Sequence, residues 1–301
     1  MKRLIFLFTL YAFAAGAQIS ELSAPVYADV KYDSYSRCQM DFFAAEGSGL
    51  RPAVVVMNPG GFTGGSKEQM RSNPILRKLF HSGVSLAIVN YRYITTDPFP
   101  APFLDGARAV QFLRSKAAEW NVDPERIGGF GGSAGANILI WLAVQDEMAD
   151  PQNTDPVLRE SSRLRCVVGN AAQTFNDPEL VLKTIGGNPA IHQSWMLAMK
   201  SGQVADFKDP KALELARQLS AINYVTPDDP PLYLVYDEKE GGTPLPPDTP
   251  VQRSIHHPLF GLMMQEKYKA AGLECIVVTP DTVNRSALIS PDKWMLKHLT
   301  E

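Results

Sequence analysis

Cysteine and histidine are scarce in this sequence, with three cysteines and five histidines among 301 residues. The spacing of Cys38, Cys166 and Cys275 fits no metal-binding motif, so we expect no metal site built on them. Three cysteines cannot all pair within one chain. Cys166 and Cys275 open apolar runs and are expected in the core, whereas Cys38 could be free or paired.

An excess of basic residues is also missing. Lysine and arginine number 29 against 32 aspartates and glutamates, and no basic cluster lies beyond the N-terminus. Nucleic acid is therefore not an expected partner. Beyond the first residues no stretch is long and apolar enough to span a membrane, and no Gly-Lys-Ser/Thr marks a phosphate loop. What is present is 45% hydrophobic residues, enough for one large domain with a sizeable core.

The N-terminus has the pattern of a secretory signal. Lys2 and Arg3 precede an apolar run from Leu4 to Ala14, and Ala15-Gly16-Ala17 fits an A-x-A cleavage site. The pattern predicts a signal peptide over residues 1–17, cut before Gln18, and export to the periplasm or the medium. Residues 18–301 would then form the folded domain, whose oligomeric state the sequence leaves open.

Beyond residue 36, apolar runs alternate with amphipathic segments. The predicted strands are Ala53–Met57, Leu86–Asn90, Arg126–Phe130, Cys166–Gly169, Leu232–Tyr236 and Cys275–Thr279. The predicted helices are Ser66–His81, Pro102–Trp120, Ala134–Glu147, Pro258–Ala271 and Pro291–Leu299. This alternation indicates an α/β fold, a doubly wound and mostly parallel sheet covered on both faces. Gln39–Ala44 alternates in polarity and fits an antiparallel edge strand.

One interval between two predicted strands, about residues 173–229, is too long for a plain crossover. It is interpreted as a small cap insertion over the site. The alternative is one ordinary helix with a long surface loop.

A G-x-S-x-G motif, with Gly131, Ser133 and Gly135, lies between a predicted strand and a predicted helix. That context is typical of a nucleophile elbow, a sharp turn that exposes the serine hydroxyl. The overlapping pattern from Gly129 to Ala134 also fits a dinucleotide-binding turn. The acid that such a site needs at the end of the next strand is absent, so the elbow is favoured.

From about Ala53 to its end, the chain resembles the α/β-hydrolase fold, and most closely esterases of the hormone-sensitive-lipase and feruloyl or acetyl-xylan esterase type. The stretches that carry the resemblance are Val54–Ser66 (V-V-V-M-N-P-G-G-F-T-G-G-S), Asn90-Tyr91-Arg92, Asp105–Ile127, the G-x-S-x-G motif and Leu219–Leu232. The resemblance implies that Ser133 is the nucleophile. It also implies an oxyanion hole from the N–H groups of Gly60, Gly61 and Ala134, although Asn58 and Pro59 replace the family's His-Gly.

The resemblance fails at the catalytic base. The family's histidine follows the last strand, where this chain has Asn284. The family's acid aligns near Glu240, with Asp237 close by. His256 and His257 follow the acid-bearing strand and should emerge at the carboxyl edge of the sheet, where sites of open α/β sheets lie. One of the two is predicted to replace the missing base; alternatively, both only cap a helix.

We therefore expect a serine carboxylic-ester hydrolase that acts through an acyl-enzyme on short acyl esters, with carbohydrate esters among the candidate substrates, and without metal or organic cofactor. The alternative is an α/β-hydrolase that has lost catalysis and serves as a binding protein. The loss of the usual histidine favours this alternative, and the intact glycine and serine motifs oppose it.

Overall fold

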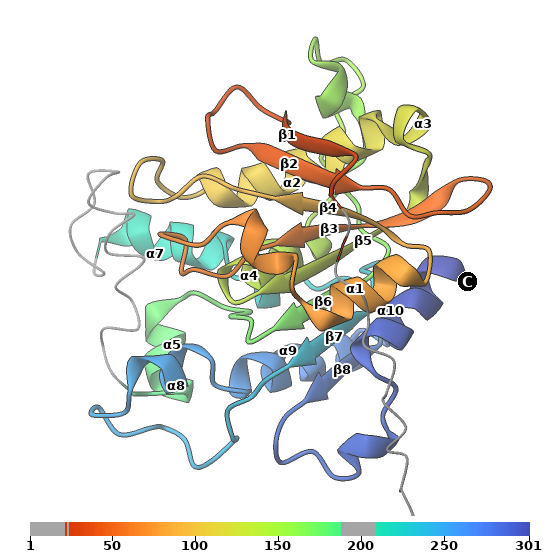
Figure 1. Ribbon diagram of the computed structural model, residues 1–301. Helices are drawn as coiled ribbons and strands as arrows, with labels where there is room; N and C mark the ends of the chain where they lie inside the picture. Colours follow the sequence, from red (N-terminus) through yellow and green to blue (C-terminus); the bar gives the residue numbers. More distant parts are fainter. Residues whose placement is uncertain (1–21, 23, 188–208) are drawn as a thin grey trace, which may run out of the picture.

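The computed structural model describes residues 22, 24–187 and 209–301 (Figure 1). It contains an eight-stranded sheet with the order β1-β2-β4-β3-β5-β6-β7-β8. The strands are β1 Tyr27–Lys31, β2 Gln39–Phe43, β3 Arg51–Met57, β4 Ser85–Val89, β5 Val122–Gly132, β6 Val167–Asn170, β7 Leu232–Val235 and β8 Cys275–Val278. The pairs β1–β2 and β2–β4 are antiparallel, and the remaining pairs are parallel.

Helices follow most strands and pack on both faces of the sheet (Figure 1). The α-helices are α1 Pro74–His81, α2 Ala101–Ser115, α3 Ala117–Trp120, α4 Ala134–Ala143, α5 Pro178–Thr184, α7 Pro210–Gln218, α8 Val251–Ile255, α9 Leu259–Ala270 and α10 Pro291–Thr300. Short 3-10 turns are η1 Lys67–Met70, η2 Pro156–Arg159, η4 Ala221–Asn223 and η5 Arg285–Ala287.

The central strands are apolar throughout because each of their faces meets a different set of helices. In β3, Val54 and Val56 belong to the cluster that contains residues of α1 and α10. Val55 and Met57 belong to the cluster on the opposite face, which contains residues of α2, α4 and α9. The expected doubly wound, mostly parallel sheet is thereby confirmed.

One local expectation needs correction. Gln39–Phe43 is antiparallel as predicted, but it is not the edge strand, because β1 pairs along its outer side. Four of the five residues of β1 are exposed, so that strand leaves no apolar pattern in the sequence. The stretch Gly241–Pro250 is rich in glycine and proline, and the short helix α8, which the sequence pattern did not predict, follows it directly.

The three cysteines are all buried and unpaired, as expected for Cys166 and Cys275. The predicted signal peptide lies outside the described residues. The predicted cap interval contains α5 and α7, but residues 188–208 lie outside the described part, so the cap stays a prediction.

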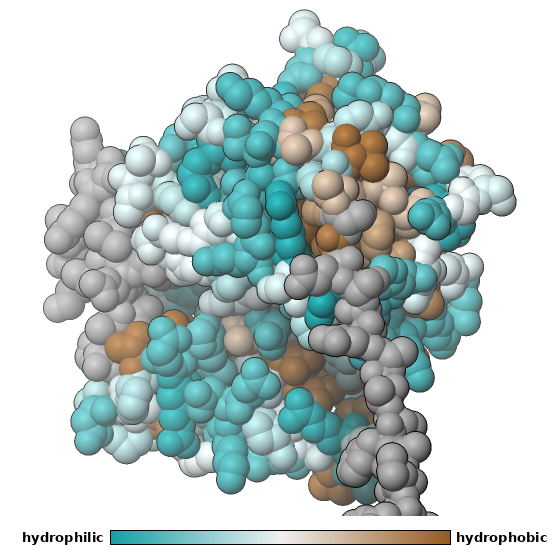
Figure 2. Space-filling model, viewed as in Figure 1, coloured by the Kyte–Doolittle hydropathy of each residue, from teal (hydrophilic) through white to brown (hydrophobic). Residues whose placement is uncertain are grey.

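Within the described ranges, no helix has the length and apolar character needed to cross a membrane. No cluster of three or more histidine, cysteine or carboxylate side chains suited to a metal ion occurs there either. The face shown in Figure 2 is mainly hydrophilic, with apolar side chains in separate patches.

Candidate active site

Ser133 lies in a sharp turn between β5 and α4. Its backbone has φ 45° and ψ −115°, a conformation that few non-glycine residues adopt. A Cβ at Gly131 would lie 2.6 Å from the Ala136 nitrogen, and one at Gly135 would lie 2.4 Å from the Met57 carbonyl oxygen. Both positions therefore require glycine, and the motif forms the strand–turn–helix geometry of a nucleophile elbow.

The Ser133 hydroxyl meets a histidine from a distant part of the chain. Its Oγ lies 3.0 Å from Nε2 of His256, a residue 123 positions later. His256 is the C-cap residue of α8, in the connection between β7 and α9. The distance is within the 2.6–3.2 Å range in which a base can accept a hydroxyl proton.

The neighbouring His257 lies in a different environment. It is 2% exposed, and its Nδ1 accepts a hydrogen bond of 3.1 Å from the backbone N–H of Leu259 at the start of α9. The sequence left two alternatives for the histidine pair, contact with Ser133 or helix capping. Each residue adopts one of them: His256 meets Ser133, and His257 caps α9.

The protonation of His256 is set by two opposing effects. Burial lowers the pKa of its imidazole, and the negative charge of Glu238 raises it, with burial the larger effect. The pKa therefore lies below the ordinary 6.5, and the ring is neutral at pH 7. A neutral ring can accept a proton.

The two acids singled out from the sequence are placed differently. Asp237 is exposed. Glu240 accepts a hydrogen bond of 3.0 Å from the hydroxyl of Thr279, and its own N–H donates to the Asp281 carboxylate at 2.9 Å. Glu240 thus ties the loop after β7 to the loop after β8.

The carboxylate whose charge acts on His256 is Glu238, which the sequence interpretation passed over. All four residues between Tyr236 and Gly241 are charged, and three of them are acids. The sequence alone does not show which of the three acids acts on His256, because that depends on the conformation of the loop. Asn284, at the family's usual histidine position, is exposed in a left-handed conformation at the start of η5.

Two of the three predicted oxyanion residues, Gly60 and Gly61, lie in the glycine-rich loop after β3, and the third, Ala134, is the first residue of α4. Gly60 has φ 136°, and a Cβ there would lie 2.1 Å from the Gly64 carbonyl oxygen. The buried Asn58 donates from Nδ2 to the Pro59 carbonyl at 2.7 Å. Since the C=O and N–H of a trans peptide point in opposite directions, this bond fixes the direction of the Gly60 N–H.

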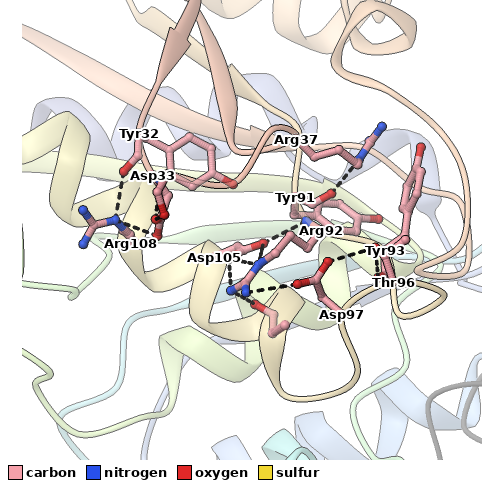
Figure 3. A network of polar contacts seen from close by, with 12 residues as sticks. Tyr32, Asp33, Arg37, Tyr91, Arg92, Tyr93, Thr96, Asp97, Asp105 and Arg108 are labelled. Atoms are coloured by element: carbon pink, nitrogen blue, oxygen red, sulfur yellow. Dashed lines mark hydrogen bonds and ion pairs between the residues drawn. The ribbon is translucent and has the colours of Figure 1, made fainter. Parts of the chain in front are cut away.

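The same loop is fastened at its far end. The Gly65 carbonyl accepts hydrogen bonds from the Arg37 guanidinium, at 3.2 Å, and from the Tyr93 hydroxyl. The Arg37 guanidinium also stacks on the Tyr93 ring, 3.6 Å from its centre. In Figure 3 these two side chains lie beside Tyr91, whose hydroxyl donates to the Asn58 carbonyl at 2.9 Å. The loop is therefore held at both ends.

A buried ion pair holds the segment after β4 against α2. Arg92, after β4, donates a bifurcated hydrogen bond from Nε to both oxygens of the Asp105 carboxylate in α2, at 2.9 and 3.0 Å (Figure 3). Asp105 is fully buried, and Asp97 lies 3.6 Å from Arg92 Nη1. This explains two stretches that carried the resemblance: the Arg92 and Asp105 motifs connect β4 to α2.

Comparison with family models matches more than half of the chain to one family. The BD-FAE family model matches residues 40–245. The Mycobacterium tuberculosis protein "Esterase LipQ" is 24% identical over 201 residues, which make up 65% of this chain and 44% of LipQ. The chain thus spans less than half the length of that relative.

Two solved structures are similar over most of this chain. A truncated carbohydrate esterase from gut microbiota has a TM-score of 0.70 and 17% identity, and covers 93% of this chain and 100% of its own. An acetyl ester-xyloside bifunctional hydrolase from Caldicellulosiruptor lactoaceticus has a TM-score of 0.63 and 22% identity, and covers 86% and 85%. At this identity the likeness shows the fold alone.

Proposed function

This chain belongs to the BD-FAE family within the α/β-hydrolases, and we propose that it is a serine carboxylic-ester hydrolase. The observation that carries the proposal is the 3.0 Å contact between Ser133 Oγ and His256 Nε2 at a nucleophile elbow. A serine hydroxyl is a weak nucleophile at neutral pH and needs such a base to become reactive.

In the first step, Ser133 Oγ attacks the ester carbonyl carbon while His256 Nε2 takes the hydroxyl proton. Nε2 must accept this proton, so Nδ1 carries the hydrogen of the neutral ring. The charge of Glu238 then stabilises the imidazolium that forms. We propose Glu238 for this role in place of Glu240 or Asp237, since it is the acid whose charge acts on His256.

The negative charge that develops on the carbonyl oxygen needs preorganised N–H donors. We propose Ala134, the first residue of α4, together with Gly60 and Gly61. The position of Ala134 at a helix N-terminus and the fixed peptide after Pro59 support this assignment. His256 then returns the proton to the leaving alcohol. The acyl-enzyme on Ser133 is hydrolysed by water, with His256 again as the base.

The substrate class is proposed from the similar proteins. LipQ is named an esterase, and the two similar structures are named a carbohydrate esterase and an acetyl ester-xyloside hydrolase. We propose short acyl esters, including those of carbohydrates, as substrates. Turnover should be measured on p-nitrophenyl acetate and butyrate and on an acetylated xyloside.

The alternative, a hydrolase fold that binds ligands without catalysis, predicts an unreactive serine. A fluorophosphonate probe should label wild-type protein and the control Ser115→Ala, whose serine ends α2 and donates to the Phe112 carbonyl. It should not label Ser133→Ala. Equal labelling of all three, or of none, together with no ester turnover, would support the binding protein instead.

A further inference from the structure

The segment that leaves β6 contacts the nucleophile on one side. The carbonyl of Asn170, the last residue of β6, accepts a hydrogen bond of 2.8 Å from the Ser133 backbone N–H. The next residue, Ala171, has φ 51°, a conformation that costs a residue with a Cβ some energy. Its N–H donates to the Val235 carbonyl at 2.7 Å, and the buried Tyr236 hydroxyl donates to the Ala172 carbonyl. The segment is thus fixed to β7 as well as to the elbow.

Three residues after Asn170, the same segment contacts the part of the chain that carries the base. Gln173 donates from Nε2 to the carbonyl of Ile255 at 2.5 Å. Ile255 is the last residue of α8 and directly precedes His256. Thr174 donates from its hydroxyl to the Phe260 carbonyl of α9 at 2.6 Å. A single short stretch therefore bridges the backbones of Ser133 and His256.

These contacts matter because α8 has few stabilising interactions within the helix itself. It is a helix of five residues that follows a glycine- and proline-rich loop, and such short helices depend on tertiary contacts. In a serine hydrolase triad a carboxylate hydrogen bond normally orients the imidazole. Among the described residues, the hydrogen bond found for the His256 ring is the one to Ser133, and Glu238 acts on the ring through its charge.

We propose that Gln173 is a positioning residue, which holds the Ile255 carbonyl and thereby sets the place of His256 relative to Ser133. The inference rests on the proposed esterase function. In it, the base is oriented by a hydrogen bond to the backbone that precedes it and not by a carboxylate bound to its ring. Gln173 itself does not touch the reacting atoms.

The test compares Gln173→Leu, which removes the donor, with Gln265→Leu. Gln265 is a matched control, because it too is half-buried and donates from Nε2 to a backbone carbonyl, that of Cys275 at 2.8 Å. Cys275 begins β8, so this control lies at the amino-terminal ends of the parallel strands, whereas Ser133 lies at their carboxyl-terminal ends. A displacement near 1 Å can cost about 10²-fold in rate. We expect Gln173→Leu to lower kcat about 10- to 100-fold with KM little changed, and Gln265→Leu to leave both unchanged.

A second readout follows the base itself. Release of α8 hydrates His256, so its pKa rises toward 6.5 and the acid limb of the kcat/KM profile moves to higher pH. NMR titration of His256 should show the same rise in Gln173→Leu and none in Gln265→Leu. Gln173→Glu keeps the side-chain size but replaces the donor with an acceptor, and serves if Gln173→Leu fails to fold.

Equal kcat and equal His256 titration in the Gln173 and Gln265 variants would overturn the inference. Failure of the proposed function looks different, because wild-type protein would then show no turnover that depends on Ser133. In that event the His256 titration still decides: a shift confined to the Gln173 variants supports the positioning role, and no shift overturns it.

Discussion

At the residue scale, the charge of Glu238 has a measurable effect on His256. Since the base must be neutral, kcat/KM falls as pH drops through the pKa of His256, which burial holds below 6.5. Glu238→Gln removes the charge that raises this pKa, so the acid limb should move to still lower pH. The rate at neutral pH should drop at least about tenfold, because the imidazolium loses its counter-charge.

The exposed neighbour Asp237 supplies the control for this pH–rate measurement. Asp237→Asn should leave both the limb and the rate unchanged. If Glu240→Gln moved the limb and Glu238→Gln did not, the acid would be Glu240, as the family resemblance implies.

Asn58 offers a second test at this scale. Asn58→Ala frees the Pro59 carbonyl, so the Gly60 N–H loses its fixed direction. Loss of a whole oxyanion donor costs about 10²–10³ in rate, and we expect kcat to fall by about 10- to 100-fold with KM little changed. Asn73→Ala is the control, because Asn73 caps α1 and its loss should cost about 1 kcal/mol of stability without lowering kcat. Similar kcat values for both variants would contradict the role of Asn58.

How much of the site could be predicted from the sequence depends on how far apart in the chain its contacting residues lie. Ser133 and its glycines could be predicted because the elbow is built from residues adjacent in sequence. The choice between His256 and His257 could not, because it depends on which ring the Leu259 N–H captures. The same holds for Glu238, which lies among other acids in one loop.

At the element scale, strands β3 to β8 could be predicted because their burial gives continuous apolar runs. β1 is mostly exposed and α8 has five residues, so neither leaves a usable pattern. Yet α8 carries the proposed base, because its C-cap residue His256 lies beside the elbow. The resemblance placed the base after the last strand, at Asn284, whereas the expected position of His256 and His257 at the carboxyl edge of the sheet pointed to the loop after β7.

The connection between β4 and α2 depends on the ion pair of Arg92 with Asp105. Arg92→Met would leave the fully buried Asp105 carboxylate without its partner, so we expect a loss of about 3–5 kcal/mol in the free energy of unfolding. Urea denaturation measures it. Arg126→Met breaks the more exposed pair with Asp123 and should cost at most about 1 kcal/mol. Equal midpoints for the two variants would show that the buried pair is not a major support.

At the scale of the whole molecule, export is the prediction that concerns residues 1–17. The charged start, the short apolar run and the A-x-A site predict cleavage after Ala17. Intact-mass and N-terminal analysis of protein from the periplasm or medium should find Gln18 first. An uncleaved Met1 on protein confined to the cytoplasm would contradict this.

The folded chain brings together Ser133 and His256, two residues 123 positions apart, and we propose that they form one catalytic pair. The most direct measurement is ester turnover by His256→Ala beside His257→Ala, each checked for folding. We predict that His256→Ala and Ser133→Ala each lose several decades of kcat, since removing one member of such a unit removes nearly all of the chemistry. His257→Ala should lose stability through its cap and keep most of its kcat. Full activity in His256→Ala would contradict the account.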